Sequence, residues 1–84
     1  MSIPQPQQTF TDKQGQYLAF IHLYTKLNRQ PPAEIDIQRY FEVTPPTVHN
    51  RVVRLEERGL ISRQRGRGRS IQVLVPPGDL PALR

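Results

Sequence analysis

The chain has 84 residues, no cysteine and a formal net charge of +5 at pH 7. A single domain of this size has a thin core, and without cysteine it has no disulfide, no thiol nucleophile and no cysteine-ligated metal. No apolar run resembles a signal peptide or approaches the roughly 20 residues of a membrane span, whereas the basic charge favours an anionic partner such as DNA, RNA or acidic lipid.

Both ends of the chain are rich in proline, and the first nine residues are also rich in glutamine. Such compositions are typical of flexible segments. We therefore predict a flexible lead over residues 1–9, a folded domain over residues 10–75 and a similar Pro-rich tail over residues 76–84.

Two helices are predicted in the first half of the domain. The first is expected to begin at Thr11, because Thr11 and Gln14 have the spacing of a capping box. Its apolar face follows at helical spacing: Tyr17, Phe20, Ile21, Tyr24 and Leu27, broadened by Leu18 and Leu23. A short second helix is expected from about Ala33 to Phe41. Its predicted buried side consists of Ile35, Ile37, Tyr40 and Phe41.

A third helix and a hairpin complete the predicted fold. Thr44 is the expected N-cap, with Pro45 at the first helical position. Val48, Val52 and Leu55 are expected to face inward, and Gly59 is expected to end the helix in a left-handed conformation. Strands are expected near Leu60–Ile61 and over Ile71–Val75. The fold class is mainly α with a small β-hairpin: a winged helix-turn-helix with three helices and a two- or three-stranded antiparallel wing.

The positive charge is concentrated in one segment. Seven of the twelve Lys and Arg residues lie between Arg51 and Arg69, where only Glu56 and Glu57 oppose them. The segment therefore carries 7 − 2 = +5, which equals the net charge of the whole chain. A polyanion is the partner that such concentration indicates.

If the inward residues of the third helix are buried, a polar face is predicted on its opposite side: Thr47, Asn50, Arg51, Arg54 and Arg58. Asn50 can present a donor and an acceptor together to adenine, and Arg51 and Arg54 are long enough for phosphate or guanine. A merely solvated helix face is the alternative. The short turn before the helix and the basic hairpin after it favour binding.

The predicted wing tip carries four arginines interleaved with glycine and glutamine: Arg63, Arg65, Arg67 and Arg69. On a hairpin, such side chains can enter a minor groove or hold phosphates. A solubilising loop and an RNA-binding Arg-Gly segment remain alternatives. Duplex DNA is favoured over RNA, because the deep major groove of A-form RNA does not admit a helix. The assignment requires the helix and the wing to present their cations on one surface.

No other constellation indicates chemistry. His22 and His49 lie on different helices without a cluster of acidic ligands, so neither a metal site nor a cofactor is expected. Glu56 and Glu57 are adjacent on a helix and point about 100° apart. No serine has a histidine and an aspartate arranged for nucleophilic work. We predict that the chain is not an enzyme and has no small-molecule substrate.

With these residues laid out, the sequence resembles the N-terminal DNA-binding domain of LexA-type repressors over roughly Phe10 to Leu74. The similar segments are Phe10–Gln14, Phe20–Ile21, Pro31–Pro32 with Glu34–Ile35 or Asp36–Ile37, Thr47–His49, Arg54–Glu57, Gly59–Ile61, Arg69 and Ile71–Leu74. The resemblance implies a cytoplasmic, nucleoid-associated regulator, expected to be a repressor, that binds double-stranded DNA. It assigns base-facing positions to Thr44, Thr47, His49 and Asn50, and it places Pro46 among the DNA-contacting positions.

The departures from the family carry their own expectations. Glu42 stands where the family usually has glycine, so the turn between the second and third helices is expected to be built differently. The chain ends at Arg84, and a stand-alone module without the family's self-cleaving, dimerising domain is expected. A homodimer through the first helix, the wing or the tails is left open. The alternative functions are a winged-helix protein-interaction module and an RNA-binding accessory factor.

Overall fold

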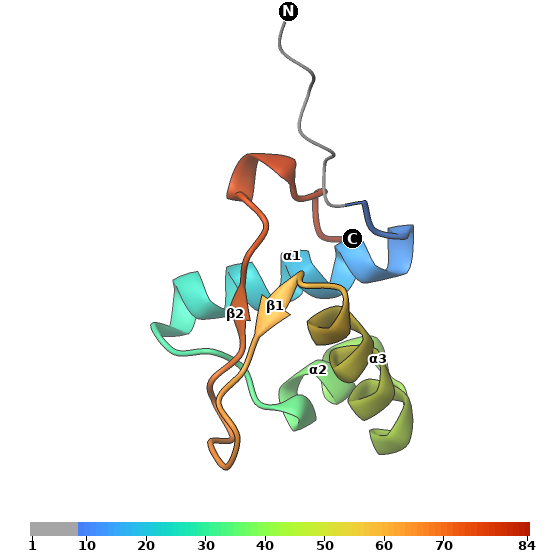
Figure 1. Ribbon diagram of the computed structural model, residues 1–84, viewed down its shortest axis with the longest axis vertical. Coiled ribbons are helices and arrows are strands. Elements are labelled where there is room, and N and C mark those ends of the chain that lie inside the picture. Colours follow the sequence, from blue (N-terminus) through green and yellow to red (C-terminus); the bar gives the residue numbers. More distant parts are fainter. Residues whose placement is uncertain (1–8) are drawn as a thin grey trace, which may run out of the picture.

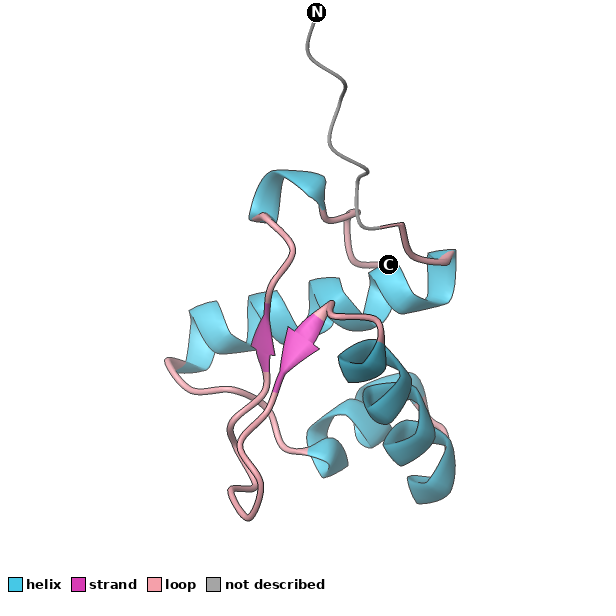
Figure 2. Cartoon of the chain, in the orientation of Figure 1, coloured by secondary structure: helices cyan, strands magenta, loops and turns pink. Residues whose placement is uncertain are grey.

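The computed structural model describes residues 9–84, in which three helices precede a two-stranded hairpin and a turn of 3-10 helix (Figure 1, Figure 2). In chain order the elements are α1 (Asp12–Asn28), α2 (Glu34–Phe41), α3 (Pro45–Glu57), β1 (Ile61–Ser62), β2 (Gln72–Val73) and η1 (Pro77–Asp79). The predicted winged fold is confirmed, and its wing is a two-stranded antiparallel sheet. Of the predicted lead, residues 1–8 lie outside the described residues.

The start of α1 is set by the predicted capping box. The Gln14 backbone N–H donates to Thr11 Oγ1 at 3.1 Å, and the Thr11 N–H donates to Gln14 Oε1 at 2.9 Å. These bonds satisfy amides that the first turn of a helix leaves without partners. At the other end, Arg29 takes a left-handed conformation (φ 58°) just before Pro31–Pro32. The long helix therefore stops where the sequence predicts.

The core lies where α1 meets the other two helices and the hairpin. Its buried apolar residues are Tyr17, Leu18, Phe20 and Ile21 from α1, Ile37 from α2, Val48, Val52 and Leu55 from α3, and Leu60, Ile61, Ile71 and Val75 from the hairpin and its flanks. Burying one such side chain contributes about 1.5–3 kcal/mol. The three inward residues predicted for α3 are all fully buried.

Two helices bury less than their patterns predict. On α2 only Ile37 is buried, whereas Ile35 and Tyr40 are each 43% exposed. Ile35 lies about 200° around the helix from Ile37, on the side away from the core. Leu27 in the last turn of α1 is 79% exposed, because this end of the helix projects past the hairpin (Figure 1). The predicted buried positions of Ile35 and Tyr40 were wrong, and Leu27 of the predicted apolar face of α1 lies in solvent.

The turn between α2 and α3 contains Glu42 in a left-handed conformation (φ 55°). The N–H groups of Glu42 and Val43 both donate to the Gln38 carbonyl, which closes the end of α2. Glycine adopts this conformation at little cost. A glutamate at the expected glycine position therefore takes a backbone conformation that favours glycine.

The C-terminal residues fold back onto α1 instead of extending as a flexible tail (Figure 1). The Gln16 Nε2 group donates to the Ala82 carbonyl at 2.9 Å, and the Arg84 N–H donates to Gln16 Oε1 at 2.8 Å. Leu80 and Leu83 pack against the core. The division at residue 76 stays a prediction, but the flexible tail is corrected, because a buried glutamine pairs with the backbone of the tail.

This docking explains why seven consecutive residues of α1, from Gly15 to Ile21, are buried. The other elements cover one side of the helix, and the C-terminal segment covers the opposite side. A Cβ atom at Gly15 would stand 2.9 Å from Phe10 Cε1 and 3.0 Å from Pro81 Cγ. Glycine therefore permits the close approach of both segments. None of the helices among the described residues is long and apolar enough to cross a membrane.

The first testable prediction concerns this docked segment. Replacing Gln16 with alanine (Gln16→Ala) removes two partly buried hydrogen bonds, so the free energy of unfolding should fall by about 1–2 kcal/mol. The backbone amide of Arg84 should exchange its hydrogen faster, as measured by NMR. Gln30→Ala, at an exposed glutamine, is the matched control. Unchanged exchange at Arg84 in the Gln16 variant would show that the segment is held by other contacts.

Candidate nucleic-acid interface

Local bonds at both ends fix where α3 begins and ends. At its start, Thr44 Oγ1 lies 2.8 Å from Thr47 Oγ1 and accepts from the Thr47 N–H at 3.4 Å. At its end, Gly59 takes the predicted left-handed conformation (φ 73°), with its N–H donating to the Glu56 carbonyl. The Leu60 N–H donates to the Leu55 carbonyl. This pair of bonds is a Schellman motif, and it directs the chain into β1.

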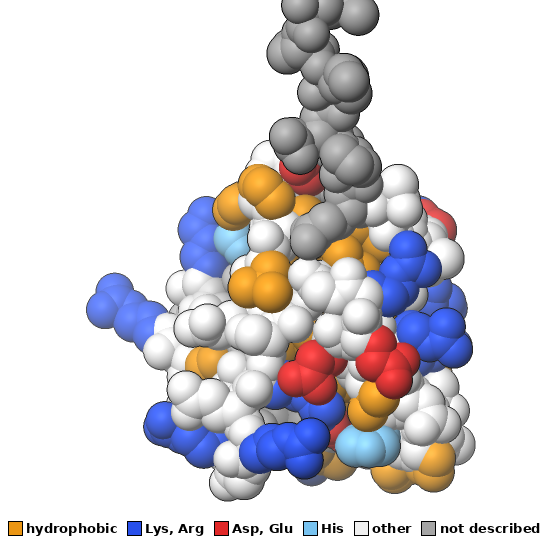
Figure 3. All heavy atoms as spheres, in the orientation of Figure 1, with side chains coloured by type: hydrophobic (Ala, Val, Ile, Leu, Met, Phe, Trp, Pro, Cys, Tyr) orange, Lys and Arg blue, Asp and Glu red, His pale blue; other side chains and the backbone are white. Residues whose placement is uncertain are grey.

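The surface of α3 has two flanks of different charge. The flank toward the wing carries His49, Val53, Glu56 and Glu57, which form one wall of a cleft. The residues at the base and tip of the wing form the other wall: Arg63, Gln64, Arg65, Gly66 and Arg67. In Figure 3, acidic side chains over α3 separate the basic side chains of the wing from those at the far edge of the helix. The helix and the wing thus adjoin, although most cations of α3 lie on its other flank.

The predicted base-facing residues lie together at the N-terminal half of α3. Exposed side chains at this end of the helix are those of Thr44, Pro46, His49 and Asn50, and Thr47 is half-buried. The Thr44 and Thr47 hydroxyls bond each other in the cap. Asn50 is therefore the exposed amide of this end of the helix, with its donor and acceptor side by side.

The β-ladder of the wing is very short, so side-chain contacts at the root of the wing are needed to hold it. Only Ile61 with Val73 and Ser62 with Gln72 are paired, and the Leu74 N–H adds one bond to the Leu60 carbonyl. The predicted strands were longer. A two-stranded hairpin of this length is not stable alone.

One set of side chains, the wing-root network, joins the wing to both α2 and α3. Arg63 Nη2 donates to Glu56 Oε1 at 2.9 Å, and Arg63 Nη1 lies 3.5 Å from Glu34 Oε2. The Glu34 carboxylate also lies 3.2 Å from His49 Nδ1. The other ring nitrogen of His49, Nε2, takes no part in this contact. Two carboxylates therefore oppose the charge of Arg63. No group of three or more metal-ligating side chains that could hold a metal ion occurs in the described part of the chain.

A second clamp holds the other strand of the wing. Arg69 Nη1 donates to the Tyr24 hydroxyl and the Pro31 carbonyl, each at 3.2 Å, and lies 3.0 Å from Asp36 Oδ2. The bond to Tyr24 and the charge of Asp36 raise the pKa of the Arg69 guanidinium. Arg69 was predicted at the wing tip, but its contacts tie it to α1 and α2.

The remaining wing arginines lie at the tip. Ser70 Oγ accepts from the Gln64 N–H at 2.9 Å, and its hydroxyl lies within donating distance of the Gln64 and Arg67 carbonyls. Gly66 in the same turn takes a left-handed φ of 77°. Arg65 and Arg67 are exposed, and the Arg67 guanidinium donates to Gln64 Oε1 at 3.2 Å, within the same loop. The structure therefore separates two positioned arginines from two at the solvent-facing tip.

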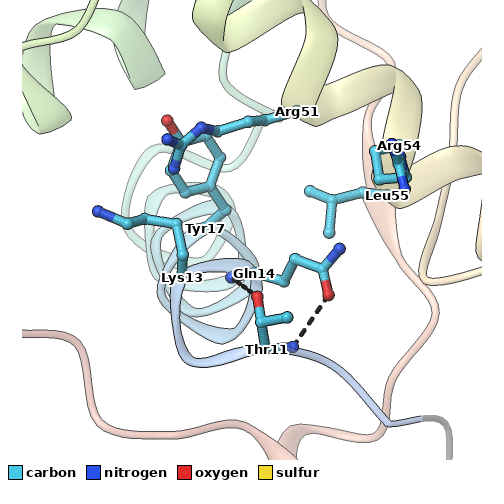
Figure 4. A pocket seen from close by; sticks show the side chains of 7 residues that line it. All are labelled: Thr11, Lys13, Gln14, Tyr17, Arg51, Arg54 and Leu55. Atoms are coloured by element: carbon cyan, nitrogen blue, oxygen red, sulfur yellow. Dashed lines mark hydrogen bonds between the residues drawn. The ribbon is translucent and has the colours of Figure 1, made fainter.

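Arg51 does not lie on the outer face of α3 as predicted. Its guanidinium carbon stands 5.4 Å from the centre of the Tyr17 ring, which places the side chain against α1 (Figure 4). At about 100° per residue, Arg51 is only about 60° from the buried Val48 and therefore belongs to a flank of the helix. Arg58 likewise turns away, since its Nη2 donates to the Thr9 carbonyl at 3.0 Å. Arg54 is exposed, with Glu57 3.9 Å away.

The sequence reasoning missed the residues that position the wing and those that face Arg51. Glu34, Asp36 and Lys13 were noted only within segments that resemble the family. Lys13 lines a pocket with Arg51 and Arg54. No local signal marks these roles, because each depends on a partner at least 15 residues away in the sequence.

The network at the wing root can be tested by stability. Arg63→Met keeps the aliphatic stem but removes the bonds to Glu56 and Glu34, so the free energy of unfolding should fall by about 1 kcal/mol. Arg65→Met, at the exposed tip, should change it by less than about 0.5 kcal/mol. Urea denaturation measures both. Equal effects of the two substitutions would contradict the distinction between positioned and tip arginines.

Comparison with known proteins assigns the family. The sequence profile of the LexA DNA binding domain matches residues 7–70, well over half of the chain. The chain therefore belongs to this family. The match ends within the wing, just after Arg69.

Several curated relatives are LexA repressors. The LexA repressor of Thermosipho melanesiensis is 38% identical over 64 residues, which cover 76% of this chain and 32% of the relative. That of Thermosipho africanus is 36% identical, with 80% and 34% covered, and that of Thermotoga neapolitana is 36% identical, with 75% and 32% covered. The chain spans about a third of the length of the curated relatives it matches.

Proposed function

We propose that this member of the LexA DNA-binding domain family binds double-stranded DNA sequence-specifically, as part of a transcriptional repressor. The observation that carries the proposal is the cleft between α3 and the wing, whose walls bring His49 of α3 and the tip arginines Arg65 and Arg67 to one side of the domain. A helix fits the major groove of B-DNA, and a cationic hairpin beside it reaches the flanking backbone or minor groove. The names of the relatives support the repressor role.

Base readout is assigned to the N-terminal half of α3. Thr44, Pro46 and Thr47 have short side chains, which let the backbone approach base edges. Asn50 is exposed beside them, and its amide offers a donor and an acceptor that complement the N7 acceptor and N6 donor of adenine in the major groove. His49 contacts Glu34 through Nδ1, so its Nε2 is the ring nitrogen assigned to a base or a phosphate.

Backbone binding is assigned to two sets of arginines on either side of that helix. Arg65 and Arg67 extend from the wing tip, and Arg54, with Arg51 behind it, flanks α3 on the other side. Arg63 and Arg69 contribute by holding the wing in place, because their guanidinium groups are bonded to α1, α2 and α3. The tip arginines are therefore assigned to DNA affinity, and Arg63 and Arg69 to the position of the wing.

The wing assignment predicts a change in salt dependence. Arg65→Ala and Arg67→Ala should each weaken binding to every duplex sequence and reduce the slope of log affinity against log salt by about 1. Fluorescence anisotropy titrations at several salt concentrations measure the slope. Lys26→Ala removes the same charge from the last turn of α1 and should leave the slope unchanged. A slope that both wing variants leave unaltered would remove the wing tip from the interface.

The assignment of Asn50 predicts a change in specificity. Asn50→Ala should relax the preference at one base pair, at a cost of about 1–3 kcal/mol on the preferred sequence, because a bidentate contact is lost. Selection from a random duplex pool near physiological salt, followed by sequencing, compares the variant with the parent chain. A uniform loss over all sequences would contradict base readout by this residue.

The same selection addresses the alternative functions. Two half-sites separated by about one helical turn would indicate a dimer. Enrichment of no duplex sequence, together with tighter binding of single-stranded RNA, would favour an RNA-binding role. Binding to neither nucleic acid at low salt would favour a protein-interaction module.

A further inference from the structure

The His49 side chain of α3 is held by a residue of another helix. His49 Nδ1 lies 3.3 Å from Glu34 Oε1 and 3.2 Å from Glu34 Oε2. Glu34 is the first residue of α2, and its Oε2 atom is also 3.5 Å from Arg63 Nη1 at the root of the wing. Figure 1 shows the first turn of α2 between the wing and α3. One carboxylate therefore contacts a side chain from each wall of the cleft.

The contact with Glu34 determines which ring nitrogen of His49 carries the hydrogen. An ionised carboxylate only accepts hydrogen bonds, so Nδ1 must be the donor. In a neutral imidazole the other nitrogen is then an acceptor, and here that nitrogen is Nε2. The His49 side chain is 58% exposed, and within residues 9–84 its Nε2 has no hydrogen-bond partner. Neutral His49 therefore presents a free acceptor at the cleft.

The charged groups around the His49 ring are balanced in number. Glu34 faces the ring from α2, and the other charged side chains of the cleft are Glu56 and Glu57 from α3 and Arg63, Arg65 and Arg67 from the wing. Three carboxylates thus accompany three guanidinium groups. The carboxylate in direct contact with the ring is that of Glu34, so a proton added to the ring stays beside a negative charge.

Protonation changes the role of one ring nitrogen and not of the other. Histidine is the side chain that ordinarily changes charge between pH 5 and 8. Both nitrogens of a protonated imidazole are donors. His49 Nδ1 therefore keeps its bond to Glu34 in both charge states, whereas Nε2 changes from an acceptor to a donor.

We propose that Glu34 is a positioning residue that determines specificity, because it makes His49 read one base pair differently in its two charge states. The inference rests on the proposed function. Neutral His49 accepts at Nε2 from an exocyclic amino group in the major groove, N6 of adenine or N4 of cytosine. Protonated His49 donates from Nε2 to guanine, whose N7 and O6 are both acceptors.

The first test needs no DNA and uses the whole chain labelled with ¹⁵N. Two-bond ¹H–¹⁵N correlations of the imidazole ring distinguish a hydrogen on Nδ1 from one on Nε2. Above the pH at which the ring titrates, His49 should carry its hydrogen on Nδ1. Glu34→Gln should give a mixture of both forms, because an amide can both donate and accept. The hydrogen on Nε2 in the parent chain would overturn the proposal.

The second test measures base preference in both charge states. Selection from a random duplex pool is carried out at about pH 8 and about pH 5.5, on either side of the ordinary titration of histidine. At one position, the ratio of guanine to adenine and cytosine should be about fivefold to tenfold higher at the lower pH. Circular dichroism at both pH values checks that the chain stays folded.

Variants assign this change to the pair of residues. His49→Gln should remove it, and Glu34→Gln should reduce it, because the neutral ring is then no longer restricted to the acceptor form. His22→Gln, at the other histidine of the chain, should leave the change intact. The same change in His49→Gln as in the parent chain would contradict the proposal.

Arg63→Met separates the proposed role of Glu34 from a purely structural one. This substitution removes the tie between the Glu34 carboxylate and the wing but keeps the contact between Glu34 and His49. The change of base preference with pH should therefore persist in Arg63→Met, even where overall affinity falls. An equal loss of the change in Arg63→Met and Glu34→Gln would show that Glu34 acts only through the wing, and would overturn the proposal.

The selection also distinguishes this inference from the proposed function. Sequence-specific binding with the same base preference at both pH values would overturn the inference and leave the proposed function in place. Enrichment of no duplex sequence at either pH would overturn both.

Discussion

The wing depends on two arginines that bind it to the helices. Its ladder joins only two residue pairs, too few to hold a hairpin in water. Arg63 bonds one strand to Glu56 and Glu34, and Arg69 bonds the other to Tyr24, Pro31 and Asp36. These contacts fix the side of the domain on which the wing tip lies. The cleft between α3 and the wing therefore depends on the bonds that Arg63 and Arg69 make to other parts of the same chain.

This use of charge changes how the basic segment is understood. The +5 carried between Arg51 and Arg69 does not form one continuous cationic surface. Arg63 and Arg69 are matched by carboxylates, while Arg51 turns toward Tyr17. The exposed charge is divided between the wing tip and the far flank of α3, with Glu56 and Glu57 between them. A duplex in the proposed orientation would meet cations on both sides of the helix.

The burial of α1 on two sides also depends on contacts between residues far apart in the sequence. A buried glutamine and one glycine let the C-terminal segment pack closely against α1. On the opposite side, the start of the same helix meets α3, where the Arg51 guanidinium packs over the Tyr17 ring. One helix thus contacts the wing, the C-terminal segment and α3.

The sequence by itself determined the local elements: the capping box at Thr11, the start of α3 at Thr44 and its left-handed end at Gly59, together with the inward face of α3. Each is encoded by residues within one or two helical turns of each other, so periodicity and cap chemistry suffice to find it. Only the tertiary structure decided which arginines reach solvent, where the C-terminal tail packs and that Gln16 binds the backbone of that tail. Those outcomes depend on partners far apart in the chain, such as Arg69 with Tyr24 or Gln16 with Ala82, and packing alone brings them within hydrogen-bonding distance.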